Sequence, residues 1–194
     1  SASMIKIPIM VACIKAEADG RIAPDERLKM SRADKTGGSG RLRRSRSGTS
    51  YSIDHLVDLM VTRSDNTATN MIIDRLGFDY INGTFKEVGL ERTRLLRKMM
   101  DMRSRDRGVE NFTTARETAE VLEQIYSKGC VSPAVSDKCL EVLKAQKIND
   151  RIPRLLPRDA VVAHKTGLER EVCHDAGIVF TDNGDFLISV FTRT

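Results

Sequence analysis

The sequence predicts a mixed α/β protein with a mostly helical lobe followed by an antiparallel sheet. In residues 1–157, apolar residues recur at helical spacing between stretches rich in glycine, proline and charge. In residues 158–194, apolar runs alternate with polar positions, and Asp182–Asp185 has the composition of a hairpin turn. A chain of 194 residues can form two small lobes around a shared cleft. We expect a helix in 1–18 between the lobes, a helical lobe in 19–157 and paired strands in 158–194.

The first predicted helix runs from Ser3 to about Ala18 and has almost no polar surface. Only Lys6 interrupts its apolar residues near the start, so the helix is expected to be buried on all sides. Pro8 is tolerated only in the first turns of a helix, which places the helix start close to Ser3. The pair Asp19–Gly20 ends it.

Predicted loops separate the other helices of the helical lobe. Residues 31–50 are rich in Gly, Ser and Arg and are typical of an extended surface loop. Residues 92–112 lack periodicity and carry many charges, so they are predicted to form a long loop, and such loops are often functional. The expected helices are Ser52 (as N-cap) to Thr62, Thr67 to Leu76, Phe78 to Val88, Thr114 to Tyr126 and Val135 to Gln146.

The expected strands are Val161–Lys165, Cys173–Thr181 and Phe186–Thr192. Three strands with an uncovered apolar face make a poor stand-alone sheet. We therefore expect that the sequence is a fragment, or that another segment or a partner chain covers the sheet.

Composition and charge indicate an ordinary globular protein with no nucleic-acid partner. The net charge is +5, and part of it lies at Arg41, Arg43, Arg44 and Arg46. Such a cluster can bind nucleic acid, but no aromatic residues are interleaved with it, which favours a solvated loop. No signal peptide and no membrane-spanning segment is visible in the sequence.

The four cysteines, Cys13, Cys130, Cys139 and Cys173, have no C-x-x-C or metal-ligand spacing. No metal site is therefore expected. Cys13 lies in an apolar run and is predicted to be a buried thiol. Pairing of Cys130 with Cys139 is left open.

Three short motifs carry the functional signal: S-x-x-K at Ser3–Lys6, S-D-N at Ser64–Asn66 and K-T-G at Lys165–Gly167. An S-x-x-K alone is expected about once in a chain of this length, whereas each of the other two is expected in only about a few of a hundred such chains. A second K-T-G, at Lys35–Gly37, lies in a glycine-rich loop and precedes Ser64. The copy after the apolar run Val161–Ala163 is therefore preferred.

A serine hydroxyl becomes a good nucleophile only when a base takes its proton. A spacing of three residues brings Lys6 to the same helix face as Ser3. A lysine in an apolar helix is desolvated, which favours its neutral, proton-accepting form. The positive end of the helix dipole favours charge developing at Ser3. Taken alone, the motif is equally compatible with a buried serine and a lysine that reaches out to solvent.

In this order, the three motifs resemble the signature of class A β-lactamases and penicillin-binding proteins. The stretch Thr62–Asn70 resembles the core of the helical lobe of class A β-lactamases, and Arg92–Leu95 resembles the entry to their Ω-loop. The resemblance implies a β-lactamase/transpeptidase-like fold and a periplasmic or extracellular location. It also implies that the family's N-terminal strands and terminal helix lie outside this sequence.

The resemblance implies a role for each motif. Ser3 would be the nucleophile and Lys6 its base. Ser64 would pass a proton to the leaving nitrogen, and Asn66 would hold the substrate's acylamino group. Ser64–Asn66 is also a good helix start, and the two interpretations are compatible.

By the same resemblance, Lys165 and Thr166 would attract the substrate carboxylate. Gly167, which has no Cβ, would let the substrate backbone lie close. The N–H of Leu168 would form the oxyanion hole together with that of the nucleophile. His174, on the next strand, is expected to face Lys165 and to add to anion binding. A plain strand end remains the alternative interpretation of this segment.

The chain departs from the family in the Ω-loop. Class A enzymes carry there, within E-x-x-L-N, a glutamate that activates the deacylating water. This chain reads Leu96–Met102 at that point and contains no E-x-x-L-N. Asp101 and Glu110 are the nearest carboxylates, and Asp101 is the candidate for deacylation. Formation of the acyl-enzyme is therefore better supported than its hydrolysis.

Three functions follow as hypotheses, none of which requires a cofactor. The first is a β-lactamase-like serine hydrolase that opens β-lactam rings through a Ser3 acyl-enzyme. The second is a D,D-peptidase-like penicillin-binding protein that acts on D-Ala-D-Ala-type peptides and is acylated but slowly deacylated by β-lactams. The third is a non-catalytic binding protein of the same fold. The presence of Ser3, Lys6, Ser64 and Lys165 together argues against it, because a protein without catalytic activity has no physical need for all four.

Overall fold

The computed structural model describes residues 1–193 and contains a helical part and two antiparallel sheets. The helices are α1 (Lys6–Ala18), α2 (Ile53–Thr62), α3 (Asn66–Leu76), α4 (Phe78–Glu87), α5 (Met102–Asp106), α6 (Ala115–Tyr126) and α7 (Pro133–Lys144). Short 3₁₀ turns are η1 (Ala2–Ile5), η2 (Leu42–Arg44) and η3 (Ile152–Leu155). The strands are β1 (Arg27–Lys29), β2 (Ser50–Ser52), β3 (Val161–Glu169), β4 (Val172–Phe180) and β5 (Phe186–Arg193).

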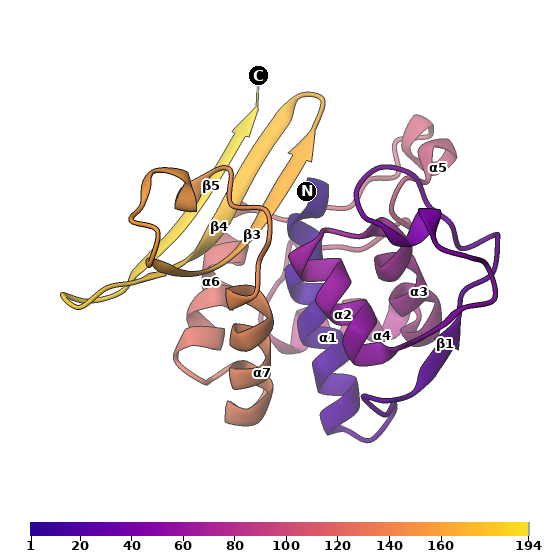
Figure 1. Cartoon of the computed structure of the whole chain (residues 1–194), viewed down its shortest axis with the longest axis horizontal. Coiled ribbons are helices and arrows are strands. Elements are labelled where there is room, and N and C mark those ends of the chain that lie inside the picture. The colour runs from indigo at the N-terminus through magenta and orange to yellow at the C-terminus, as the bar shows by residue number, and fades with distance from the viewer. Residues whose placement is uncertain (194) are drawn as a thin grey trace.

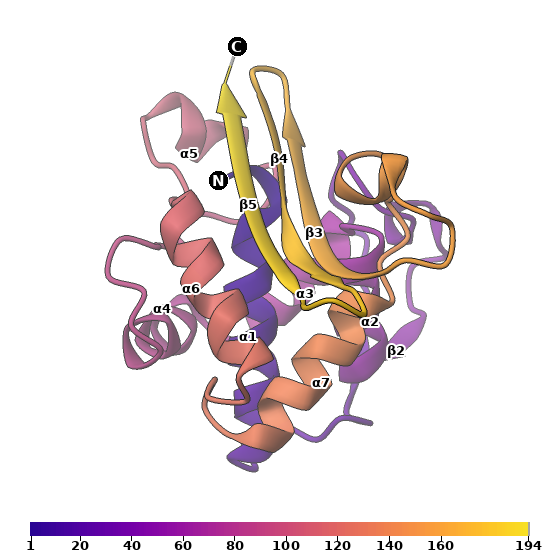
Figure 2. The same cartoon turned by 90° about the vertical axis from the view of Figure 1, so that its left-hand side faces the viewer.

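The elements are arranged as a helical body beside a three-stranded sheet, which confirms the predicted mixed α/β class (Figure 1). The sheet has the order β3-β4-β5, with both pairs antiparallel. Helices α6 and α7 pack against the sheet, and η1 lies against β3 and β4 (Figure 2). Helix α1 runs between the sheet side and α2, α3 and α4, so its start is held at the junction of the two parts.

Helix α1 is enclosed by apolar neighbours, as its composition predicts. Its residues from Lys6 to Ile14 are all buried, because α2, α4 and α7 pack around it. The α-helix proper begins at Lys6 rather than Ser3, and the preceding residues form η1. Pro8 therefore lies in the first turn, where its missing N–H costs no hydrogen bond.

Three features of the secondary structure differ from the sequence prediction. The predicted loop 92–112 contains α5, because the Asp101 side chain caps Ser104 N and starts a helical turn. The segment from Arg27 to Ser52 contains the short pair β1–β2. The first strand of the main sheet continues to Glu169, because K-T-G pairs with β4 instead of ending the strand.

The main sheet leaves apolar side chains in contact with solvent. Leu168, Phe186, Leu187 and Val190 are exposed, although α6 and α7 cover one face. The cover that we expect from another segment or chain remains a prediction. Within residues 1–193, every helix is too short or too polar to traverse a lipid bilayer. The four cysteines are all free thiols.

Glu117 of α6 fixes the start of the charged loop 92–112. Its buried carboxylate accepts hydrogen bonds from Arg92 N at 2.6 Å and Thr93 N at 2.7 Å, and from Thr93 Oγ1 at 2.6 Å. A buried carboxylate is stable only with such donors. The loop entry is thereby attached to the helix that also supports the sheet.

Replacing Glu117 by alanine is expected to lower the free energy of unfolding by about 3 kcal/mol, because three donors lose their acceptor. Glu120→Ala on the same helix is the matched control. The Glu120 side chain is exposed and its carboxylate accepts no hydrogen bond from any residue within 1–193, so a change below about 0.5 kcal/mol is expected. Chemical denaturation of both variants measures the difference. Equal stabilities would contradict the proposed role of Glu117.

Candidate active site

Ser3 lies in η1, at the entrance to the buried helix α1, and its side chain is partly exposed. The preceding residue, Ala2, has a φ of 45°, a left-handed conformation that is uncommon for a residue with a side chain. Strain of this kind persists where the surrounding structure imposes it, often at functional sites. The Ser3 hydroxyl makes no hydrogen bond to any residue within 1–193, so it is available to a ligand.

Lys6 is completely buried one turn further along the chain. Its Nζ donates to Ser64 O at 2.6 Å, Ser64 Oγ at 3.1 Å and Asn66 Oδ1 at 2.7 Å. Burial lowers the pKa of Lys6 well below its ordinary value, and the nearby Lys165 lowers it further, while Asp65 opposes the shift. The S-x-x-K and S-D-N motifs, about sixty residues apart in sequence, thus meet at one amine.

Lys165 reaches the same hydroxyl from β3. Its Nζ donates to Ser64 Oγ at 3.1 Å and to Thr166 O at 2.7 Å. Burial lowers the pKa of Lys165 to about 7, with Asp175 opposing the shift and Arg151 adding to it. Ser64 therefore accepts from two lysines, which leaves its own proton free to be donated elsewhere.

Ser64 and Asn66 are placed by the junction of α2 and α3. Ser64 has a φ of 53°, and Asp65 is the N-cap of α3, accepting from Ala68 N at 3.0 Å. The carboxylate of Asp65 also accepts from the backbone N–H groups of Arg41 and Leu42. The cap interpretation and the catalytic interpretation of S-D-N therefore coexist in this structure.

The second K-T-G does not supply a second set of catalytic groups. Lys35 Nζ donates to Ser45 O at 2.6 Å, outside the junction. The loop nevertheless forms a wall of the site, since Gly37 O accepts from Asn66 Nδ2 at 3.0 Å. At Gly38 (φ +75°) a Cβ would lie 2.7 Å from Asn66 Nδ2, so glycine is required there.

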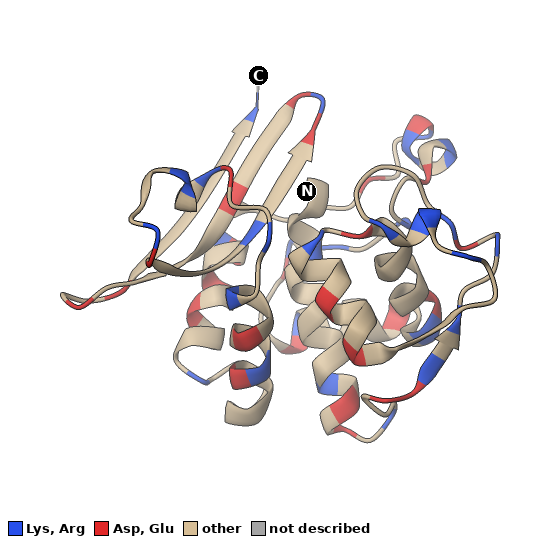
Figure 3. Cartoon of the chain, in the orientation of Figure 1, with Lys and Arg blue, Asp and Glu red and all other residues tan. Residues whose placement is uncertain are grey.

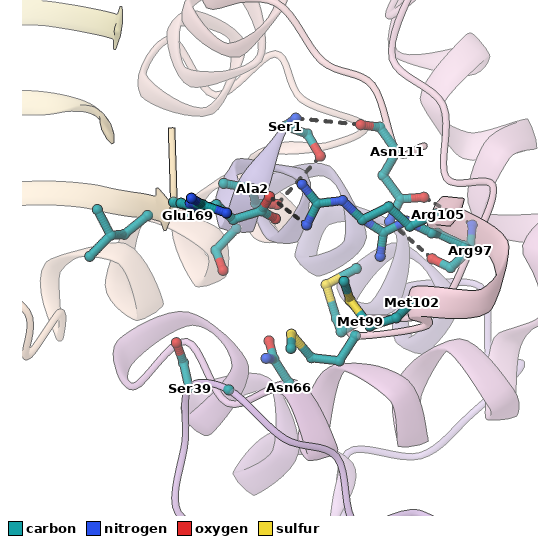
Figure 4. A pocket seen from close by; sticks show the side chains of 15 residues that line it. Ser1, Ala2, Ser39, Asn66, Arg97, Met99, Met102, Arg105, Asn111 and Glu169 are labelled. Atoms are coloured by element: carbon teal, nitrogen blue, oxygen red, sulfur yellow. Dashed lines mark hydrogen bonds and ion pairs between the residues drawn. The ribbon is translucent and has the colours of Figure 1, made fainter. Parts of the chain in front are cut away.

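A cavity of about 310 Å³ opens beside Ser3 (Figure 4). Its lining includes Ser1–Ser3, Gly38, Ser39, Asn66 and, from the end of β3 and the following turn, Leu168–Arg170. Segment 97–111 contributes three methionines, two arginines and Asn111. Lys165, Thr166 and Gly167 are buried and do not line this cavity. Gly167 packs on Met4, whose Cγ would lie 3.1 Å from an added Cβ.

His174 is not directly opposite Lys165. The register of the sheet pairs Lys165 with Ala176 and His174 with Gly167, so His174 lies on the same face as Lys165 but two residues away along β4. A contribution of His174 to anion binding stays a prediction. The His174 ring stacks on Phe191, with centroids 4.2 Å apart, and accepts from Thr192 N at 3.2 Å. Burial lowers its pKa, which disfavours a charged, anion-binding form.

Asp101 is not brought to the cavity. Its carboxylate accepts from Ser104 N at 3.0 Å and Ser104 Oγ at 2.7 Å, and these hydrogen bonds lower its pKa. Met99 is one of the loop residues that line the cavity with Ser3. The Asn70 side chain fixes its backbone, accepting from Met99 N at 2.8 Å and donating to Met99 O at 3.1 Å. Because the sequence has no E-x-x-L-N pattern, it does not indicate that Met99 lines the cavity. The only signal is indirect: Asn70, which binds Met99, lies in the stretch that resembles the family.

Glu110, the other nearby carboxylate, forms ion pairs with two arginines. It pairs with Arg97 at 2.7 Å and with Arg105 at 3.2 Å. Arg105 also lies 3.6 Å from Glu169, at the end of β3. These ion pairs connect the loop to the sheet and were not predicted from the sequence. Residues 1–193 contain no group of three His, Cys, Asp or Glu side chains arranged to hold a metal ion.

Comparisons with known proteins agree with this geometry. The solved structure of PBP-A has 37% sequence identity and a TM-score of 0.87, covering 98% of this chain and 70% of that chain. A β-lactamase from Sphaerobacter thermophilus has 31% identity and a TM-score of 0.91, covering 99% and 73%. An extended-spectrum β-lactamase of Pseudomonas aeruginosa is 25% identical over 158 residues, which are 74% of this chain. The chain spans about half the length of this curated relative, since it covers 50% of it.

The family model described as "Beta-lactamase enzyme family" matches residues 1–194. The match extends over the helical part, the sheet and all three motifs. Family and fold together support a function like that of serine β-lactamases and penicillin-binding proteins. The chain therefore belongs to the β-lactamase enzyme family.

Proposed function

We propose that the protein is a serine acyl-transfer enzyme of the penicillin-binding-protein type, which β-lactams acylate at Ser3 and which releases the acyl group slowly. One observation carries the proposal: two buried lysines meet at Ser64, and Lys6 also contacts Asn66, which lines the cavity together with Ser3. The loop residues that line this cavity, Met99 among them, include no carboxylate. The first group of residues favours acylation. The second disfavours hydrolysis of the product. A periplasmic or extracellular location, as is usual in the family, belongs to the proposal.

In the proposed acylation, neutral Lys6 takes the proton of Ser3, and Ser3 Oγ attacks the carbonyl carbon of the β-lactam. The carbonyl oxygen would be held by the backbone N–H groups of Ser3 and Leu168. The C–N bond then breaks, and the nitrogen receives a proton from Ser64, whose hydroxyl is replenished by a neighbouring lysine. The low pKa of Lys6 supports this role, because a neutral amine is a base near pH 7.

The charge of Lys165 has a separate use in this scheme. Together with Thr166 it would attract the substrate carboxylate, as the family resemblance implies. Asn66 would hold the acylamino group, although its amide already contacts Lys6 and Gly37. The substrate would therefore bind to groups that are oriented before it arrives.

Deacylation needs a base that takes a proton from water, and a methionine thioether is not one. Glu169 lines the cavity but is paired with Arg105. A leucine-to-glutamate variant of the similar PBP-A has been captured as an acyl-enzyme complex with penicillin G. That complex supports β-lactams as acyl donors for the present chain.

A hydrolytic β-lactamase is the second candidate function. It is favoured by the relatives from Sphaerobacter thermophilus and Pseudomonas aeruginosa, which are described as β-lactamases. Steady turnover of a chromogenic cephalosporin would support this candidate, whereas a stable adduct supports the first. A D-Ala-D-Ala-type peptide is the proposed physiological donor in the first case.

Ser3→Ala is expected to abolish the covalent adduct with benzylpenicillin, because the attacking oxygen is removed. Intact-mass measurement after incubation detects the adduct as a gain of one penicillin mass. Ser47→Ala, at an exposed serine far along the chain, is the control and is expected to be acylated like the unmodified protein. An adduct that persists in the Ser3→Ala protein would overturn the assignment of the nucleophile.

The rate of acylation is expected to have a maximum in pH. On the acid side Lys6 becomes protonated and loses its function as a base. On the alkaline side Lys165, with a pKa of about 7, loses the charge that attracts the carboxylate. In Lys165→Arg the side chain stays charged at all accessible pH values, so the alkaline decrease should disappear. Stopped-flow acylation between about pH 5 and pH 9 measures both limbs, and an unchanged alkaline limb in the variant would contradict the role of Lys165.

Met99→Glu is expected to raise the rate of deacylation by about 100-fold, because it places a base beside the acyl-enzyme. Asn70 holds the backbone of residue 99, so the new carboxylate keeps the position of the thioether. Met99→Gln has a similar shape and no basic group, and it is the matched control. The loss of the benzylpenicillin adduct with time is measured for both proteins. Equal rates would show that residue 99 does not face the acyl bond.

A further inference from the structure

The cavity beside Ser3 has a charge distribution that the proposed acylation does not use. Three arginines line it, Arg97, Arg105 and Arg170, but only one carboxylate, Glu169. In Figure 4 the guanidinium of Arg105 extends across the cavity toward Glu169. In Figure 3 the region around α5 carries both basic and acidic residues. Among the side chains that line the cavity itself, however, basic groups outnumber acidic ones.

The arginines differ in how firmly they are engaged. Arg97 is 7% exposed, and its guanidinium donates to Glu110 through Nε and Nη2 and to Lys98 O through Nη1. These hydrogen bonds connect Arg97 to other residues of the loop, so its guanidinium has little capacity to bind a ligand. Arg105 is 43% exposed and makes two ion pairs, but its guanidinium donates no hydrogen bond to any residue within 1–193. Arg105 can therefore accept a new partner at little cost.

Arg170 adds a second available guanidinium. It is exposed in the two-residue turn between β3 and β4 and forms no ion pair with residues 1–193. Arg105 and Arg170 line the same cavity, one from the loop and one from the turn of the sheet. Arginine binds carboxylates in a bidentate manner, and an exposed ion pair such as Arg105–Glu169 contributes only about 0–1 kcal/mol.

Methionines form the apolar part of the cavity. Met99, Met100 and Met102 line it. In Figure 4, Met99 and Met102 lie between Asn66 and the two labelled arginines. Methionine side chains are flexible and adapt to ligands of different shape. They suit the apolar stem of an acyl side chain, and the arginines beyond them suit an anionic end.

The geometry points to a preference for acyl donors whose side chain carries a carboxylate, with Arg105 exchanging Glu169 for that carboxylate and Arg170 assisting. A donor with a cationic side chain would be repelled by the same guanidinium groups. This inference rests on the proposed function and specifies its substrate class. It depends on residues of this chain outside the three motifs.

Three penicillins test the preference with a single change of charge. Benzylpenicillin, carbenicillin and ampicillin carry hydrogen, a carboxylate and an ammonium group, respectively, on the same side-chain carbon. Second-order acylation rate constants are measured by intact mass. We expect carbenicillin to react about tenfold faster than ampicillin, with benzylpenicillin between them, and the difference to shrink at high salt.

Variants show which residues cause the preference for an anionic side chain. Arg105→Gln is expected to lower the carbenicillin-to-ampicillin ratio about tenfold, and Glu169→Gln to raise it. Arg103→Gln removes the same charge from the same short helix but outside the cavity, so the ratio should not change. An unchanged ratio in Arg105→Gln, or a faster reaction of ampicillin with the unmodified protein, would overturn the inference.

The proposed function is tested separately by the benzylpenicillin rate alone. The charge preference is also measured without acylation, as equilibrium binding of the three penicillins to the Ser3→Ala protein by calorimetry. The same order of affinities supports the preference even if no adduct forms, and equal affinities contradict it. Failure of acylation and failure of charge selection therefore give different results.

Discussion

The burial of two lysine side chains around one serine hydroxyl is the constraint on which the site depends. Burying an ammonium group is unfavourable unless it loses its proton or finds several acceptors. Lys6 has three acceptors, and they come from Ser64 and Asn66, on the segment that starts α3. Lys165 approaches from the sheet. The contact therefore brings the start of α1, the rest of the helical part and the sheet together at one point, and each part must be folded for the amines to find their acceptors.

The elements with strong local signals could be predicted from the sequence. The apolar periodicity of α1, α2, α6 and α7 and the turn at Asp182–Asp185 gave the mixed fold, because burial and turn chemistry are encoded locally. The three motifs pointed to Ser64 and to both lysines, which the structure brings into contact. Their assignment to catalysis stays a prediction, since it came from family resemblance.

The features that were missed depend on long-range pairing. The register of β3 against β4 decides which residue lies opposite Lys165, and the sequence does not give this register. In the structure Ala176 lies opposite Lys165, and His174 lies opposite Gly167. In the loop, Asp101 was selected as a carboxylate in the expected region, but a side chain that caps a helix is already engaged. The ion pair between Arg105 and Glu169 joins segments about sixty residues apart. Periodicity in the sequence reports only local structure, so it does not indicate which distant charged residues will pair.

The attachment of Met99 through hydrogen bonds to its backbone has an evolutionary consequence. Asn70 binds only the peptide groups of this residue, so these hydrogen bonds persist whichever side chain is present there. The Met99 side chain is buried, so a substitution changes the local packing but not the hydrogen bonds that fix the backbone. A lineage could therefore explore different lifetimes of the proposed covalent intermediate by substitutions at one site, while the backbone around that site is inherited unchanged.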